Sequence, residues 1–191
     1  MDHGIRRYRA SDEEAWLRCR VLAFLHTAYF DDVQTAKPAV PPPGLELVAA
    51  DPSGEIRGIL DIAIEGETAT IDTIAVHPDH RSRGIGRALL QEATVHLFEL
   101  RVGALEAWTR DDPATLRWYR SNGFAETNHY LHVYADYYSD PAEPDRAIAE
   151  RRAGLRPIKA FLHATLDEEA AIRERFARVH VCRRFTQDLR G

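Results

Sequence analysis

The sequence feature that most constrains the fold is a change of hydrophobic period around residues 80–90, which read HRSRGIGRALL. Residues 68–76 alternate in the manner of a strand, whereas apolar residues recur every three or four positions from Ile85 onward, as along one face of a helix. A helix that begins at such a loop presents unpaired backbone N–H groups and a partial positive charge. Because Gly84 and Gly86 have no Cβ, a ligand can approach the backbone closely there. The segment therefore predicts a phosphate-binding loop.

Three other kinds of loop share part of this pattern. A nucleotide P-loop is excluded, because it needs Lys followed by Ser or Thr after its last glycine, and this chain has Arg and Ala there. A dinucleotide-binding fingerprint fits Gly84 and Gly86, and Glu106 follows about 20 residues later, where an acid that binds ribose belongs. Leu89, however, stands where its third small residue is needed, which weakens the case for a nicotinamide-binding oxidoreductase. The third alternative is a plain surface loop before a capped helix, which is enough to explain the two glycines when they are considered without the rest of the sequence.

Length and composition indicate one globular domain, with or without an appendage. The 191 residues are 45% hydrophobic and 29% charged, and no apolar stretch approaches the roughly 20 residues of a membrane helix. The first residues lack the apolar centre of a signal peptide, so we expect a cytoplasmic protein with no membrane partner. The two cysteines, Cys19 and Cys182, are far apart in the chain and are expected to be core residues rather than a disulfide or zinc ligands.

Charge is divided unevenly along the chain. Residues 141–191 hold 11 basic and 8 acidic residues, a net charge of +3, and residues 1–140 carry −8. The acidic larger part argues against nucleic acid as a partner and favours a cationic ligand.

Periodicity and turn residues predict mixed helices and strands. The helix over 13–30 would bury a face formed by Leu17, Val21, Phe24 and Ala28, and the proline-rich segment 31–44 must be a loop. Strands are expected at 4–10, 45–50, 56–64, 68–76, 104–109 and 129–138, and further helices from Gly84 and over 114–122. The remainder reads as a short helix at 146–154, then a strand at 158–166, a helix at 167–178 and a strand at 179–189.

Two motifs resemble those of the GNAT superfamily of N-acetyltransferases. The segment TIAVHPDHRSRGIGRALL is similar to its acyl-CoA-binding motif, Arg/Gln-x-x-Gly-x-Gly/Ala, which Arg81, Gly84 and Gly86 meet. The segment LEAWTRDDPATLRWYRSNGF resembles its second motif, in which a strand leads to a polar residue, a helix carrying a tyrosine, here Tyr119, and a Gly-Phe ending. Asp112 falls where many members have Asn. Two motifs at this separation are far more specific than one.

The resemblance implies an α/β (α+β) GNAT fold, with a mixed, mostly antiparallel central sheet flanked by helices. It covers roughly residues 4–138, so residues 1–138 are expected to form the acetyltransferase domain. Residues 139–191 would then be a C-terminal strand-helix-strand extension that packs on the sheet or on a second subunit of a homodimer. Val179 and Val181, with Phe185, would face inward there.

The resemblance also implies where acetyl-CoA, the co-substrate, would bind. It would lie between splayed parallel strands at 72–76 and 105–109, where a bulge in the first strand frees backbone groups. The Val76 N–H would polarise the acetyl carbonyl. The residues implied in cofactor binding are Ile74, Ala75, Val76, Arg81, Ser82, Arg83, Gly84, Ile85, Gly86, Arg87, Asp112 and Tyr119.

The implied reaction is direct attack of an amine of a small molecule or peptide on the thioester. It needs a neutral amine, a stabilised oxyanion and a protonated leaving thiolate, and Tyr119 would supply the proton to the sulfur. Asp72 is the first candidate for the base, through a water, with Glu106 as the second and His77 as the third. The alternative function is a non-catalytic acyl-CoA-binding regulatory domain that keeps the loop but lacks a working base.

The acceptor site in this family is built from the first helix, the loop after it and the late strands. Tyr29, Asp31 and Asp32 would present aromatic and acidic groups to an amine there. We expect no metal, because His129 and His132 lie three positions apart on a strand and therefore point to opposite faces.

Overall fold

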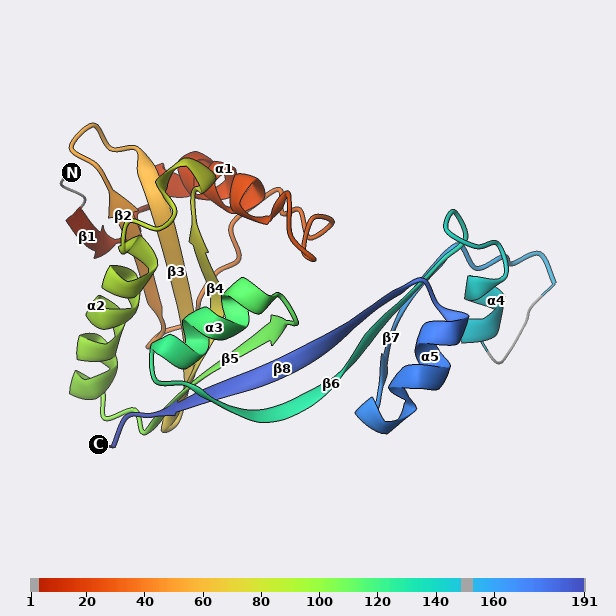
Figure 1. Ribbon diagram of the computed structural model, residues 1–191. Coiled ribbons are helices and arrows are strands. Elements are labelled where there is room, and N and C mark those ends of the chain that lie inside the picture. The colour runs from red at the N-terminus through yellow and green to blue at the C-terminus, as the bar shows by residue number, and fades with distance from the viewer. Residues whose placement is uncertain (1–3, 149–152, 191) are drawn as a thin grey trace.

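The computed structural model describes residues 4–148 and 153–190. One eight-stranded sheet runs through it in the order β1-β2-β3-β4-β5-β8-β6-β7 (Figure 1). Neighbouring strands are antiparallel except β4 and β5, which are parallel. The predicted mixed, mostly antiparallel sheet flanked by helices is therefore confirmed. The strands are β1 (Gly4–Arg7), β2 (Leu45–Ala50), β3 (Ile56–Glu65), β4 (Thr68–Val76), β5 (Ala104–Arg110), β6 (Ala125–Asp136), β7 (Lys159–Ala164) and β8 (Arg178–Asp188).

Of the five helices, α1, α2 and α3 cover the two faces of the first five strands (Figure 1). They are α1 (Glu13–Phe24), α2 (Ile85–Glu99), α3 (Pro113–Ser121), α4 (Glu143–Ala147) and α5 (Glu169–Arg175). The α1 helix packs on one face, in a cluster with Val48 of β2 and Ile59 of β3. The α2 helix and Tyr119 of α3 share the main apolar cluster on the other face with Leu60 of β3 and Leu105 of β5. No helix of the described residues is long and apolar enough to span a membrane.

The α1 helix buries a different face from the one its sequence predicted. It ends at Phe24, and Val21 is 36% exposed, while its buried residues are Trp16, Cys19, Arg20 and Ala23. Leu17 and Phe24 of the predicted face are half-buried and pack against the same cluster, so the buried face is rotated from the predicted one. The rotation arises because Arg20 lies inside, where its guanidinium reaches Asp32 in the following loop, and Trp16 is fully buried beside it. Both cysteines, Cys19 and Cys182, are buried and free, as predicted.

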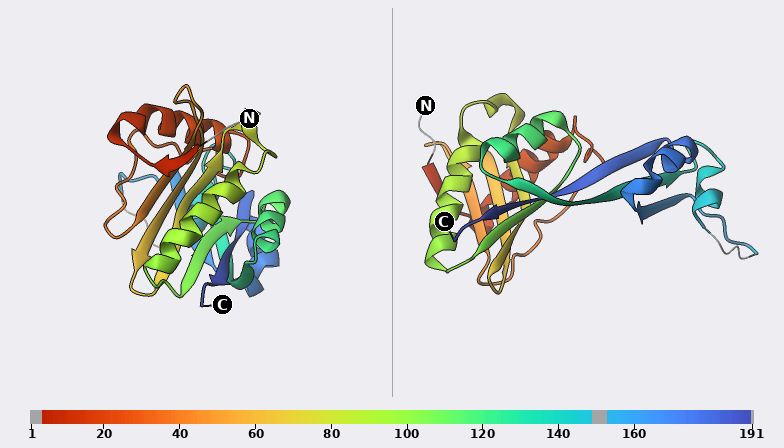
Figure 2. Two further views of the ribbon diagram at one scale, coloured as in Figure 1. Left: turned by 90° about the vertical axis from the view of Figure 1, so that its left-hand side faces the viewer. Right: turned by 60° about the horizontal axis from the view of Figure 1, so that its bottom comes forward.

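Strands β6 and β8 leave the body of the molecule as a long antiparallel arm. The arm ends in a lobe that contains β7, α4 and α5 (Figures 1 and 2). This lobe has a separate small core, whose buried members are Leu131, Val133, Ala135, Phe176, Val179 and Val181. The distal lobe, as we name residues 139–177, is thus tied to the body by two strands alone.

The strand-helix-strand order predicted for the last part of the chain is present as β7, α5 and β8. Whereas β7 and α5 belong to the distal lobe, β8 returns to the body. There it lies between β5 and β6, and Phe185 pairs with Ala107. Residues 178–188 are therefore an interior part of the sheet. Part of the helix expected at 146–154 lies outside the described residues, and α4 occupies 143–147.

Candidate functional site at the gap between β4 and β5

The two parallel strands pair over only four rows. Thr68–Ile71 of β4 face 104–107 of β5, and the pairing stops there. On its other side β4 pairs with β3, where Asp61 faces Thr73 and Ile62 faces Ile71. Asp72 is left as an extra residue, which is a β-bulge, and bulges re-aim a strand and end its pairing. The remaining residues of the two strands, 72–76 and 108–110, therefore border a gap in the sheet.

The backbone of β4 offers hydrogen-bond donors to this gap. The N–H of His77 donates to the carbonyl of Arg57 in the β3 segment, at 2.9 Å. Successive N–H groups of a strand point to opposite sides, so those of Ile74 and Val76 turn away from β3. These two donors thus lie along the edge that faces β5.

The glycine loop lies at the end of β4 and starts α2. Gly84 is the N-cap of α2 and has a φ of +81°, a conformation that favours glycine. Gly86 is different, because a Cβ added there would meet Trp118 at 3.5 Å and Val76 at 3.6 Å, which are ordinary contacts. The fold itself therefore does not require glycine at position 86, whereas close approach of a ligand would.

The basic residues of the loop have different surroundings. The Arg81 guanidinium donates to the carbonyl of Ala23 at 2.6 Å and so fastens the loop to the end of α1. Arg83 Nη1 lies 3.4 Å from His80 Nδ1. Ser82 has a φ of +60° and, with Arg83 and Arg87, is exposed. The α2 N-terminus and two exposed arginines make this end of the gap suitable for an anion.

Asp112 and Tyr119 belong to the second motif and have distinct roles in the structure. Asp112 caps α3 by accepting from the backbone N and the Oγ1 of Thr115, both at 2.8 Å, and these bonds lower the pKa of its carboxyl. Tyr119 is 4% exposed and stacks on Phe185 at 5.3 Å between ring centroids. Burial, and then Tyr29, raise the pKa of Tyr119, so its hydroxyl keeps its proton.

The two candidate bases differ in their electrostatic surroundings. Desolvation, and then the charge of Glu65, raise the pKa of Asp72. Glu106 of β5 instead lies 3.5 Å from Arg184 Nη1 through its Oε1 atom. A carboxylate with a raised pKa and no cation is the better proton acceptor, which favours Asp72. The third candidate, His77, accepts from the Asp79 N–H at 3.3 Å in a turn.

The predicted acceptor residues lie beyond the last row of the β4 and β5 pairing. The Tyr29 hydroxyl accepts from the backbone N–H of Arg110 at 2.8 Å. Arg178 of β8 holds Asp31 through two hydrogen bonds of 2.6 and 2.9 Å, and Arg20 holds Asp32 at 2.7 Å. Tyr29 thus borders the gap, whereas both carboxylates already have cationic partners.

Sequence reasoning missed the arginines of this region. Arg110, at the end of β5, hydrogen-bonds to residues of the first loop and of β6, and Arg178 comes from the far end of the chain. The sequence offered one signal for this region. Tyr130 and Tyr134 are four positions apart on β6, so their side chains lie on the same face of that strand. In the described ranges, 4–148 and 153–190, no group of three or more His, Cys, Asp or Glu residues could hold a metal ion.

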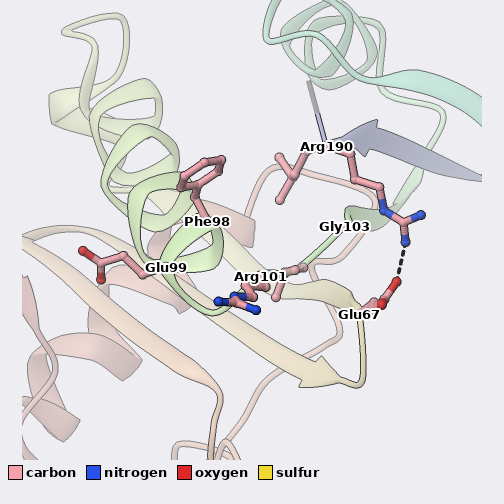
Figure 3. Close-up of a pocket in the computed structure, with 8 residues that line it drawn as sticks. Glu67, Phe98, Glu99, Arg101, Gly103 and Arg190 are labelled. Atoms are coloured by element: carbon pink, nitrogen blue, oxygen red, sulfur yellow. Dashed lines mark hydrogen bonds and ion pairs between the residues drawn. The ribbon is translucent and has the colours of Figure 1, made fainter.

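A separate hollow lies at the other end of α2. Figure 3 shows Phe98, Glu99 and Arg101 at the end of the helix, with an ion pair between Glu67 and Arg190 nearby. The glycine loop is at the opposite end of this 15-residue helix, so the hollow is distinct from the gap.

Comparison with known protein families and solved structures shows which fold this chain shares. Residues 43–126 match the family model described as an acetyltransferase (GNAT) domain. No curated protein sequence matches the chain. Among solved structures, the ribosomal-protein-S18-alanine N-acetyltransferase from Escherichia coli is 17% identical with a TM-score of 0.61, over 98% of this chain and 94% of that one.

Two further solved structures contain a cofactor. The PaiA N-acetyltransferase from Thermoplasma acidophilum, in complex with coenzyme A, is 15% identical with a TM-score of 0.57, over 66% of this chain and 92% of that one. A GNAT family acetyltransferase from Elizabethkingia anophelis, with acetyl-CoA bound, is 18% identical with a TM-score of 0.56, over 97% of each chain. At these identities the likeness shows a shared fold. The chain therefore has the GNAT fold, and its residues 43–126 match the acetyltransferase (GNAT) domain model.

Proposed function

We propose that the protein is an N-acetyltransferase that transfers the acetyl group of acetyl-CoA to a primary amine of a small molecule or peptide. The observation that carries the proposal is the gap between β4 and β5. It has the N–H groups of Ile74 and Val76 along one edge, and the glycine N-terminus of α2 follows β4. Such a gap suits a long ligand with a carbonyl near one end and a pyrophosphate near the other.

The residues around the gap supply the three requirements of amine acetylation. The Val76 N–H would stabilise the oxyanion, which forms when the amine nitrogen bonds to the carbonyl carbon. Asp72, whose pKa is raised, would take a proton from the acceptor ammonium through a water, which gives the neutral amine that attacks. The protonated Tyr119 would then give a proton to the sulfur as the carbon–sulfur bond breaks. A non-catalytic acyl-CoA-binding domain would have no need of the last two groups.

The first test is ligand-dependent stability. Acetyl-CoA or CoA at about 100 times its Kd should stabilise the folded protein by about 2.7 kcal/mol, whereas NADH and ATP should have no effect. Thermal unfolding with each ligand separately measures this. Release of free thiol from acetyl-CoA, in the presence of a panel of amines, then distinguishes the enzyme from the non-catalytic domain. Stabilisation by NADH alone would contradict the proposal.

The substitution Gly86→Ala tests whether CoA binds at the glycine loop. The added Cβ has room in the protein and alanine favours the helix, so the free variant should be at least as stable as the wild type. The Cβ would, however, hold a pyrophosphate away from the backbone, and we expect CoA to bind at least about tenfold more weakly, the loss of roughly one charge-assisted hydrogen bond. Gln91→Ala, at an exposed position of the same helix, is the control. Unchanged CoA affinity in Gly86→Ala would place the phosphates elsewhere.

We also propose that the distal lobe serves a homodimer. The lobe, residues 139–177, holds 7 basic and 8 acidic residues, so its net charge is close to zero and does not oppose contact between two lobes. The face of the lobe opposite α5 exposes Phe161, at 54%. Two such apolar faces can pack against each other, so sedimentation velocity should give the mass of a dimer. Phe161→Asp should shift it toward the monomer, and a monomer at all concentrations would refute the proposal.

A further inference from the structure

The acceptor side of the gap contains a buried guanidinium with no anionic partner. Arg110, the last residue of β5, is 7% exposed. Its Nη1 donates to the carbonyl of Ala28, its Nη2 donates to the hydroxyl of Tyr134, and its Nε donates to His132 Nδ1 at 3.4 Å. These three acceptors are neutral. No carboxylate of the described residues lies within ion-pair distance of Arg110.

This arrangement is unusual because a buried cation is costly unless an anion compensates it. The ring of Tyr29 lies 4.2 Å from the guanidinium carbon, and such contacts return only part of that cost. Neighbouring arginines on β8 are compensated, since Arg178 binds Asp31 and Arg184 lies 3.5 Å from Glu106. The positive charge of Arg110 is therefore available to a bound anion.

Asp31 is near enough to feel the charge of Arg110, but its carboxylate is already paired with Arg178 at 2.6 Å. On the same face of the arm, His132 of β6 faces His180 of β8 on one side and His163 of β7 on the other. Burial, and then Arg110 and the other two histidines, lower the pKa of His132 to about 4, so its ring is neutral near pH 7. Asp111 is near His180, at 3.7 Å, rather than Arg110.

Arg110 also lies in the right place to meet an acceptor. Its own backbone N–H donates to the Tyr29 hydroxyl at 2.8 Å, beyond the last paired row of β4 and β5. Its side chain contacts Ala28 of the first loop and Tyr134 of β6, and so lies on the side of the gap where that loop is. The glycine loop and the α2 N-terminus follow β4 instead.

We propose that the acceptor amine carries a carboxylate, as a free amino acid does, and that Arg110 binds this carboxylate. Arginine has five N–H donors, of which three are used, and guanidinium groups pair well with carboxylates. The inference rests on the proposed N-acetyltransferase function and narrows its substrate class. It also explains why Asp31 and Asp32 are bound to arginines rather than left for an ammonium group.

The test compares acceptors that differ only in the carboxylate. Each amino acid is assayed with acetyl-CoA beside its amide and its decarboxylated amine, and kcat/KM is measured by thiol release. One charge-assisted contact predicts a preference of about 10-fold to 100-fold for the free acid, expressed mainly in KM.

The variant Arg110→Gln tests whether the Arg110 side chain causes the preference for the free acid. The variant should lose activity toward the acid by that same factor while activity toward the amide stays near the wild-type value, a pattern that general damage to the fold would not give. Arg146→Gln, at an exposed arginine of the distal lobe, should change neither. If Arg110→Gln does not fold, Arg110→Lys keeps the charge with fewer donors and should retain part of the preference.

The outcomes separate this inference from the function on which it rests. A preference for the acid that disappears in Arg110→Gln supports both. Equal or faster acetylation of amides and plain amines overturns the carboxylate inference and leaves the N-acetyltransferase intact. Binding of acetyl-CoA without transfer to any amine overturns both.

Discussion

Replacing Tyr119 with phenylalanine should lower kcat by about 100-fold to 10,000-fold, the range expected for loss of a general acid. The affinity for CoA should stay the same, because the ring that stacks on Phe185 is retained and only the hydroxyl is removed. Within the described part of the chain, that hydroxyl has no hydrogen-bond partner, so its loss leaves no buried group unpaired. Steady-state kinetics and a CoA titration measure the two effects separately.

The matched control is Tyr138→Phe, at a tyrosine that is 79% exposed, and it should leave kcat unchanged. Because burial raises the pKa of Tyr119, its hydroxyl stays protonated below pH 10, and any loss of rate at low pH should come from the base. Asp72→Asn should remove that loss. A Tyr119→Phe variant with kcat within about threefold of the wild type would exclude Tyr119 as the proton donor.

Local patterns predicted most of the body of the fold. The strands that became β2, β3 and β4 alternate clearly and are separated by turn residues, and α3 has both a capping Asp112 and a stop at Gly123, whose φ is +86°. The glycine loop was predictable for the same reason, because strand, loop and helix are contiguous there. These features depend on neighbouring residues alone.

What the sequence did not show depends on contacts between distant segments. Nothing near Arg178 indicates that β8 enters the sheet between β5 and β6, since this placement brings together residues more than 40 positions apart. Arg20 looked like a surface residue until its partner Asp32 was placed beside it. For the same reason Arg110 was absent from the predicted site, although it now carries the inference about the acceptor.

Lys37, a buried lysine beneath the first loop, is another residue whose surroundings the sequence did not show. Lys37 belongs to the proline-rich segment, which predicts only a loop, yet its side chain is 3% exposed. Its ammonium contacts Glu46 of β2 and lies 3.4 Å from Asp61 of β3, and its nitrogen is 4.7 Å from the centroid of the Tyr8 ring. One cation therefore compensates two carboxylates under the loop, and it holds that loop against the sheet on the α1 side.

Lys37→Met should lower the free energy of unfolding by about 3–5 kcal/mol near pH 8, the cost of leaving a buried charge without its partner. Lys159→Met is a matched control, because Lys159 is the only other lysine of the chain and its side chain is 68% exposed. Its ion pair with Asp136, at 3.1 Å, should contribute about 0–1 kcal/mol. Urea denaturation of both variants gives the comparison.

The destabilisation by Lys37→Met should also depend on pH, and the titration of Asp61 determines whether it grows or shrinks as the pH rises. Burial raises the pKa of Asp61 to about 7 from an ordinary value of 3.8, so the folded protein holds this proton more tightly than the unfolded chain. Its contribution to stability is greatest below pH 4 and is lost as the pH rises to 7. At pH 5.5 Asp61 is neutral with or without Lys37, whereas above pH 7 the variant must keep a buried carboxylate without its cation.

The destabilisation by Lys37→Met should therefore be smaller at pH 5.5 than at pH 8, and Asp61→Asn in the same background should remove the difference. A loss of equal size at both pH values would mean that Glu46, rather than Asp61, is the partner that matters. A loss below about 1 kcal/mol at either pH would mean that the loop is held by its other contacts. The Lys37 N–H donating to Glu13 at 3.0 Å, a backbone bond that the substitution retains, is the first of these.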